Sequence, residues 1–102
     1  MKRTLRISAQ ASQQLRDISS YIRRESGHSE MAQAFRRRLV AKARQLSELP
    51  GTLGSDRPEL GDGIRSTPVG NYILIFRYTP RSLDLLAVIH ASRDVVSHFD
   101  ID

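Results

Sequence analysis

The segment Tyr72–Tyr78, with the sequence YILIFRY, constrains the fold more than any other part of the chain. Neighbouring side chains of a strand point to opposite faces. This divides the segment into two sets, which are Tyr72, Leu74, Phe76 and Tyr78 on one face and Ile73, Ile75 and Arg77 on the other. Both sets are largely apolar, so other parts of the protein should cover both faces. A strand of this kind lies in the middle of a sheet.

Turn-forming residues flank this segment and connect it to two further apolar runs. Gly70 and Asn71 precede it and suit a tight hairpin turn. The residues TPRS, 79–82, suit a second turn after it. We therefore expect residues 64–69 and 83–91 to be the outer strands of a three-stranded antiparallel meander.

The first half of the chain predicts a short strand followed by two helices. Residues 3–7 alternate between polar and apolar side chains, as in a half-buried strand. Ser8 is a suitable N-cap for a helix whose apolar stripe is Ala11, Leu15, Ile18 and Ile22. Gly27 would end this helix, and Ser29 would begin a second one with the stripe Ala32, Phe35, Leu39, Ala43 and Leu46. Pro50 would stop the second helix, and the short connection folds the two helices into an antiparallel hairpin.

Residues 50–63 are rich in Gly, Pro, Ser and Asp, which predicts a surface loop. The order along the chain is then strand, two helices, loop and three strands. A length of 102 residues is that of one domain. We predict a single α+β domain, residues 1–102, in which the helical hairpin packs on one face of an antiparallel sheet.

The charge of the chain indicates an anionic partner. It has 16 Lys and Arg residues against 11 Asp and Glu residues, and a net charge of +5. Only Lys2 and Lys42 are lysines, so 14 of the 16 basic residues are arginines. Arginine presents a planar fork of donors that suits phosphate or carboxylate groups, and direct contact with nucleic acid is one reading of this excess. High-GC codon usage is the alternative explanation.

The composition and the N-terminus also restrict the compartment. There is no cysteine, which excludes disulfides, zinc-thiolate sites and thiol nucleophiles. The start, MKRTLRIS, lacks the apolar stretch of a signal peptide, and no apolar run is long enough to span a membrane. We expect a cytoplasmic protein without membrane contact.

Arg65, Arg77 and Arg93 are the candidate partner-binding residues. They lie within the second predicted strand, near the end of the third, and just after the fourth. If they converge at one end of the sheet, their guanidinium groups would hold phosphates or carboxylates through charge-assisted bonds. The alternative is that each is a separate surface arginine, paired locally with Asp84, Asp94 or Glu59.

Catalytic chemistry has weaker support. His90, close to Arg93, is the best candidate for a general base, although a hydrogen-bonded structural histidine is the favoured reading. His28 and His98 are expected to be exposed, and no histidine has the spacing of a metal ligand, so neither a metal nor a cofactor is expected. The strand aromatics suit base stacking, but their even spacing fits core packing better.

Several motifs occur in an order and spacing similar to a known family. They are Leu15-x-x-Ile18-x-x-Tyr21-Ile22, Leu49-Pro50, Arg57-Pro58-Glu59-Leu60, Gly63-Ile64-Arg65, Gly70-Asn71-Tyr72, Ile75-Phe76-Arg77-Tyr78 and Val88-Ile89-His90-Ala91-Ser92-Arg93-Asp94. From about Ile7 to Asp94, the chain resembles the ParE toxins of the RelE/ParE superfamily. The resemblance implies a toxin of a type II toxin–antitoxin pair that inhibits DNA gyrase and is neutralised by a ParD-like antitoxin.

The resemblance leaves two alternatives open. RelE-type relatives cleave messenger RNA on the ribosome, but this chain has Ile73 where they place an arginine and Phe99 where they place a terminal tyrosine. Only Arg93 matches them well. Since cleavage needs a proton acceptor and groups that stabilise the charged transition state, an inhibitor that acts by binding is expected rather than an enzyme. A nontoxic basic nucleic-acid-binding module is the third hypothesis.

Overall fold

A computed structural model describes residues 2–93 and 95. The elements follow the predicted order and are β1 (Thr4–Ile7), α1 (Ala9–Ser26), α2 (Ser29–Glu48), β2 (Ser55–Asp56), a 3₁₀ turn η1 (Pro58–Leu60), β3 (Ile64–Val69), β4 (Tyr72–Tyr78) and β5 (Ser82–His90). Among the described residues, no helix is long and apolar enough to cross a membrane.

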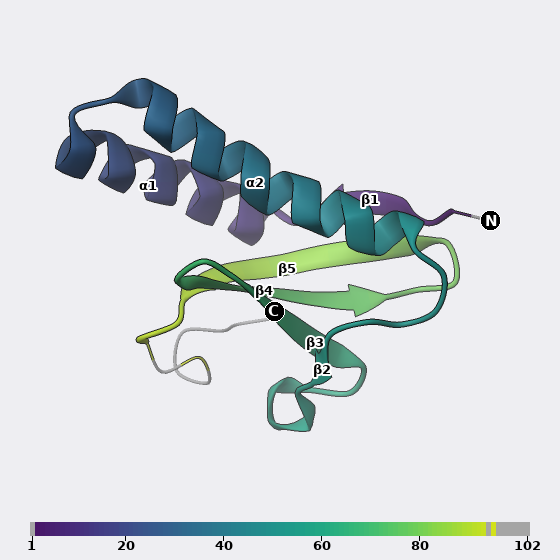
Figure 1. The fold of residues 1–102 in the computed structure, drawn as a ribbon. Helices are drawn as coiled ribbons and strands as arrows, with labels where there is room; N and C mark the ends of the chain where they lie inside the picture. Colours follow the sequence, from purple (N-terminus) through teal and green to yellow (C-terminus); the bar gives the residue numbers. More distant parts are fainter. Residues whose placement is uncertain (1, 94, 96–102) are drawn as a thin grey trace.

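The strands form one sheet in the order β1-β5-β4-β3-β2, and both helices lie on one face of it (Figure 1). The strands β2 to β5 pair antiparallel, and β4 is the central strand of the whole sheet. β1 joins the free edge of β5 in parallel, with Leu5 beside Leu83 and Ile7 beside Leu85, so the whole sheet is mixed. The predicted α+β fold is confirmed, and the parallel pairing of β1 is the detail that the antiparallel expectation did not include.

The ends of the helices agree with the sequence. The hydroxyl of Ser8 accepts a hydrogen bond from the backbone N–H of Ala11 at 3.0 Å, which is the predicted N-cap of α1. Gly27 ends α1, and α2 begins at Ser29. The two helices pack side by side as the expected antiparallel hairpin (Figure 1).

The main core lies between the helices and the sheet. Its most deeply buried side chains are Leu15, Leu39, Leu74, Phe76, Leu83 and Leu85. Tyr72 and Tyr78 pack against the same cluster, so the aromatic side chains of β4 face the helices. The even spacing of these aromatic side chains therefore reflects core packing, as predicted. A second apolar cluster covers the opposite face of the sheet and contains Ile64, Ile75, Ala87 and Ile89.

A bulge in β5 changes which of its side chains face the helices. Ile75 pairs with Ala87, whereas the next residue, Phe76, pairs with Leu85, so Leu86 is an extra residue on β5. Before the bulge, Leu83 and Leu85 face the helices; after it, Val88 belongs to the helix-side core. His90, two residues further on, therefore also lies on the helix side.

The loop after α2 is fastened to the sheet. The backbone N–H of Leu53 donates to the hydroxyl of Tyr78 at 3.2 Å. Arg65 donates from Nε to the Leu53 carbonyl at 2.7 Å and from Nη2 to the Gly54 carbonyl at 2.8 Å. The predicted surface loop thus contains two short elements, β2 and η1, that the sequence did not predict. Of the two, β2 pairs antiparallel with β3, with Ser55 beside Ser66 and Asp56 beside Arg65.

Gly54 lies too close to the sheet to carry a side chain. A Cβ atom there would lie 2.7 Å from the Ser66 carbonyl oxygen and 2.9 Å from Cζ of Phe76, and its φ is +83°. Gly51 has a similar φ of +78° with nothing within 4 Å, so it is a matched control. Gly51→Ala should cost about 1–2 kcal/mol of stability through its backbone conformation. Gly54→Ala should cost about 1–3 kcal/mol more because of the clash.

Urea denaturation of the two variants measures this difference. Equal losses of unfolding free energy for Gly54→Ala and Gly51→Ala would contradict the close packing of this loop on Phe76.

Candidate functional site

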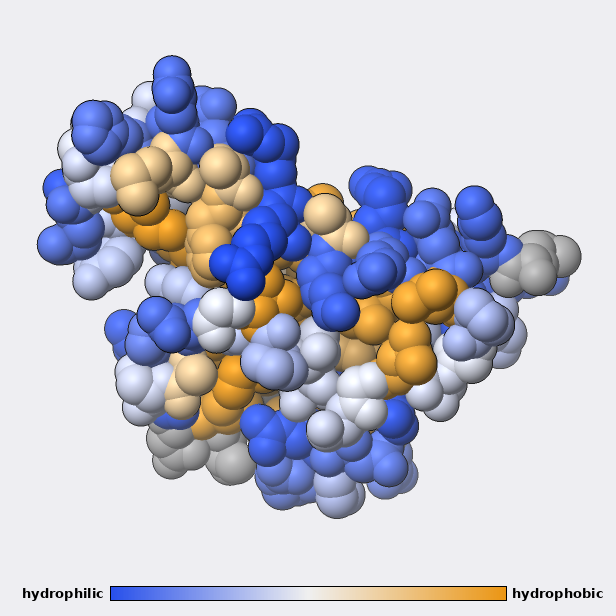
Figure 2. All heavy atoms as spheres, in the orientation of Figure 1, coloured by the Kyte–Doolittle hydropathy of each residue, from blue (hydrophilic) through white to orange (hydrophobic). Residues whose placement is uncertain are grey.

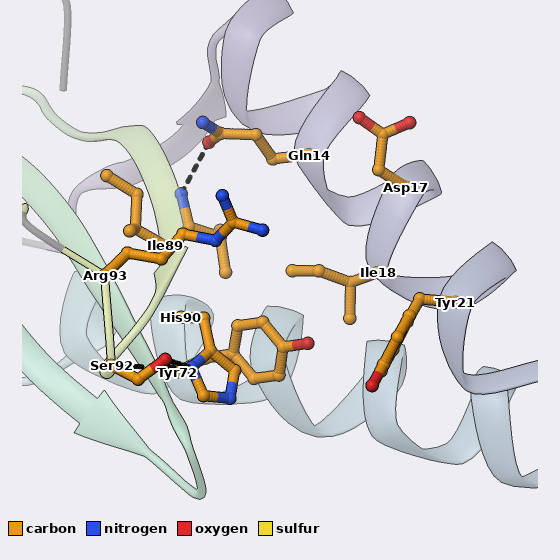
Figure 3. Close-up of a pocket in the computed structure, with 10 residues that line it drawn as sticks. Gln14, Asp17, Ile18, Tyr21, Tyr72, Ile89, His90, Ser92 and Arg93 are labelled. Carbon is orange, nitrogen blue, oxygen red and sulfur yellow. Dashed lines mark hydrogen bonds between the residues drawn. The ribbon is translucent and has the colours of Figure 1, made fainter. Parts of the chain in front are cut away.

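A cleft of about 560 Å³ lies between α1 and the neighbouring ends of β4 and β5 (Figure 3). Figure 2 shows hydrophobic surface between the helical layer and the sheet. The residues that line the cleft are Gln14, Asp17, Ile18, Tyr21, Tyr72, Val88, Ile89, His90, Ser92 and Arg93. We take this cleft as our candidate site.

The α1 wall of the cleft continues the apolar stripe of that helix. Ile18 is 8% exposed and belongs to the core, whereas Tyr21, one turn further on, is 52% exposed. Gln14 ties this wall to β5, because its side-chain oxygen accepts the backbone N–H of Val88 at 2.7 Å (Figure 3). The cleft therefore has a fixed apolar floor and an exposed aromatic side chain at its rim.

Aromatic side chains form the β4 wall. The ring of Tyr72 contacts Phe35 of α2 at a centroid distance of 5.5 Å, and the ring of His90 at 5.1 Å edge to face. Burial raises the pKa of the Tyr72 hydroxyl; nearby Tyr21 raises it further and Arg93 opposes the shift. Tyr72 therefore presents a neutral hydroxyl to the cleft at physiological pH.

His90 is held by the residues that follow it. Its Nδ1 accepts the backbone N–H of Ser92 at 3.1 Å, and the Ser92 hydroxyl lies 2.7 Å from the same nitrogen (Figure 3). In the neutral ring, this contact places the proton on Nε2. A general base needs an unprotonated nitrogen that faces the proton it removes. Because Nδ1 is already bonded, this geometry favours a structural role for His90.

The cleft combines apolar surface with a small number of charges. Arg93 extends its guanidinium into the cleft from the β5 side, and Asp17 lies on α1 (Figure 3). The described residues contain no cluster of His, Asp or Glu that could hold a metal ion. Apolar walls, two phenols and a guanidinium are suited to binding a peptide segment that carries apolar and acidic side chains.

The predicted convergence of Arg65, Arg77 and Arg93 is wrong. Arg65 pairs with Phe76 across the β3–β4 ladder, which turns it toward the helix side. Arg77 is the next residue of β4 after Phe76 and points to the opposite face. Arg93 follows His90, which pairs with Tyr72 at the far end of β4. The alternation of strand side chains and the direction of β5 therefore separate the three, and only Arg93 lines the cleft.

The acidic residues that pair with arginines also differ from the expected ones, which were Asp84, Asp94 or Glu59 as partners of Arg65, Arg77 and Arg93. Arg65 forms an ion pair with Asp56, Arg57 pairs with Glu59, and Asp84 pairs with Arg6. Asp94, His98 and Phe99 lie outside the described residues, whereas His28 is exposed as expected.

The cleft residues Gln14, Ile18 and Tyr21 were not predicted as functional. The sequence did contain a signal for Tyr21. It lies next to Ile22 and widens the apolar stripe of α1 beyond what one buried face requires.

The pair between Arg6 and Asp84 is bidentate, with Nε and Nη2 of Arg6 each 2.8 Å from a carboxylate oxygen. The hydrogen bond from Arg6 lowers the pKa of Asp84, assisted by Ser82 and the charge of Arg77, while burial opposes the shift. The folded protein thus binds the Asp84 proton less readily than the unfolded chain does. The stabilisation is present above the unfolded pKa of about 4 and is lost as pH falls through the lowered folded value.

We expect Asp84→Asn to lower stability at neutral pH and to reduce the loss of stability on acidification below about pH 4. Thermal unfolding recorded across this acidic range measures both effects. Asp62→Asn is the control, because Asp62 is exposed and forms no ion pair with the described residues. An acid response of Asp84→Asn equal to that of the unmodified protein would contradict the effect of this pair.

The sequence and the fold are similar to those of known proteins. The model of a family described as "ParE toxin of type II toxin-antitoxin system, parDE" matches residues 5–95. A solved structure titled "Chromosomal ParDE TA system from P. aeruginosa" is similar with a TM-score of 0.75; the match covers 89% of this chain and 98% of the other, at 18% identity. At this identity the likeness shows the fold alone. A search of curated proteins found no match.

Proposed function

Because the chain belongs to the ParE family of toxins of type II toxin–antitoxin systems, we propose that it arrests growth by binding DNA gyrase and that a ParD-like antitoxin neutralises it. The observation that carries the proposal is the family match, which extends over residues 5–95. The target, gyrase, comes from the resemblance to ParE toxins, and the geometry supports the mode of action, which is binding rather than bond cleavage.

The surroundings of the candidate catalytic residues disfavour ribonuclease action. Cleavage of a phosphodiester needs a proton acceptor and free cationic groups around the charged phosphorus. Nδ1 of His90 is bonded to Ser92, and the donors of Arg65 are directed to the loop carbonyls and Asp56. Ile73, at the position where RelE-type relatives place an arginine, packs beside the apolar cluster of the outer face.

A supercoiling assay with purified components tests the proposal. We expect the purified toxin to inhibit gyrase on relaxed plasmid in proportion to its concentration, and the ParD-like protein to restore activity when added in equal amount. Induced expression should stop growth and alter plasmid supercoiling. Normal supercoiling during growth arrest would contradict gyrase as the target, and messenger RNA cut at defined codon positions would assign the RelE-type activity instead.

The cleft has the chemistry of a seat for the antitoxin. An acidic, amphipathic segment of a partner would cover Ile18 and Tyr72 with its apolar side chains and place carboxylates near Arg93. Such a partner also suits a chain with a net charge of +5. Binding there would also bury the ring of Tyr21, which is 52% exposed in the uncomplexed protein.

We expect Tyr21→Glu to weaken the binding of the ParD-like antitoxin by at least about tenfold, because it removes a buried aromatic contact and adds a negative charge. Gln33→Glu is the matched control, since Gln33 is exposed on α2 and does not line the cleft. Isothermal titration calorimetry compares the two. Equal antitoxin affinities would show that the antitoxin binds elsewhere.

A further inference from the structure

Charged side chains form a row across one end of the outer sheet face, the face turned away from the helices. In the register of the sheet, Arg6 of β1 stands beside Asp84 of β5, Asp84 beside Arg77 of β4, and Arg77 beside Ile64 of β3. Directly paired residues of neighbouring strands project to the same face. We call Arg6, Asp84 and Arg77 the arginine row, and Ile64 lies at its end. Adjacent strands are about 4.8 Å apart, so Arg6 and Arg77 are separated by about 10 Å.

Among the described residues, Arg77 is a cation of this surface without an ion pair. On one side, Arg6 is paired with Asp84 at 2.8 Å. On the other side, Arg57, whose backbone N–H bonds to the Ile64 carbonyl, is paired with Glu59 at 3.2 Å. In the described part of the chain, Arg77 forms neither a hydrogen bond nor an ion pair, and it acts on Asp84 only through its charge. The positive charge in excess is therefore centred on Arg77.

The stem of Arg77 is positioned by its neighbours. A Cβ atom on Gly63 would lie 3.7 Å from Cδ and 3.8 Å from Cγ of Arg77, so the aliphatic part of the side chain lies against the backbone of Gly63. Ile64, its cross-strand neighbour, and Ile75, two residues earlier on the same face of β4, are 1% and 0% exposed. An arginine whose stem is already packed loses less conformational freedom when its guanidinium binds a ligand.

The surroundings of the row suit a protein partner better than a nucleic acid. Leu60, Ile73 and Leu86 are half-buried beside the apolar cluster of this face, and a mixture of apolar side chains with arginine is typical of protein interfaces. Single-stranded nucleic acid is held by stacking on aromatic rings, but the aromatic side chains of β4 face the helices. Asp84 is kept ionised by Arg6 and would repel phosphates.

We propose that the arginine row is the surface that meets the inhibited protein, and that Arg77 binds a carboxylate of that protein. The arginine row lies on the face opposite the helices, whereas the cleft opens between α1 and the sheet. Contact with the target and contact with the antitoxin in the cleft therefore depend on different residues. The inference rests on the proposed function in one respect, which is that the toxin acts by binding a protein.

Charge reversal at two exposed or half-exposed arginines tests the inference. Arg77→Glu should raise the toxin concentration that half-inhibits gyrase by at least about tenfold and should abolish growth arrest after induction. Arg44→Glu changes the net charge equally at an exposed position of α2, away from the row, and should retain the full effect. Arg77→Lys, which keeps the charge but loses the planar fork, should show an intermediate loss.

Binding of the ParD-like antitoxin is the control for folding, since it depends on the other surface and should be equal for all variants. If the Arg77→Glu variant does not bind the antitoxin, the milder variant Arg77→Gln is used in its place. Growth arrest by a folded Arg77 variant at the unmodified level would overturn the inference. Arrest that depends on Arg77 without inhibition of gyrase would keep the inference and reject gyrase as the target. Arg77-dependent binding to plasmid DNA alone would overturn the assignment to a protein carboxylate.

Discussion

The burial of β4 on both faces is the constraint on which the rest of the structure depends. Leu74 and Phe76 contact the helical layer, Ile75 contacts the outer apolar cluster, and β3 and β5 pair with the strand along its length. A shift of the register by one residue would exchange the two faces and expose the core. The same alternation places Phe76 inside and its neighbour Arg77 outside, so the outward position of Arg77 follows from the packing of the core.

The bulge at Leu86 connects this packing to the cleft. Without the extra residue, Val88 and His90 would alternate onto the outer face, together with Ile64 and Ile75. With it, Val88 supplies part of the floor of the cleft and His90 contacts Tyr72. Local irregularities of a strand often direct side chains toward a binding site in this way. The two surfaces of the toxin, the cleft and the arginine row, thus share one strand and lie on its opposite faces.

The sequence predicted the elements and the fold class because periodicity, caps and turn residues are local signals. Ser8, Gly27 and the Gly70-Asn71 turn occupy their expected places, and the aromatic side chains of β4 form the core. The parallel pairing of β1 and the fastening of the loop to Tyr78 are contacts over long sequence separations, which local patterns do not encode. The arginines were placed wrongly because their faces depend on register, and neither the cleft nor the bulge leaves a local pattern.

The side chains of Ser8 and Gln14 form hydrogen bonds that cover part of the edge of β5. β1 ends at Ile7, so the outer edge of β5 beyond Leu85 has no neighbouring strand among residues 2–93. There the Ser8 hydroxyl donates to the Leu86 carbonyl at 3.0 Å, and the Gln14 amide oxygen accepts the N–H of Val88 at 2.7 Å. An uncovered edge recruits strands from other molecules. The side chains of the N-cap residue Ser8 and of Gln14 in α1 thus occupy part of this edge and protect the uncomplexed protein against sheet-to-sheet aggregation.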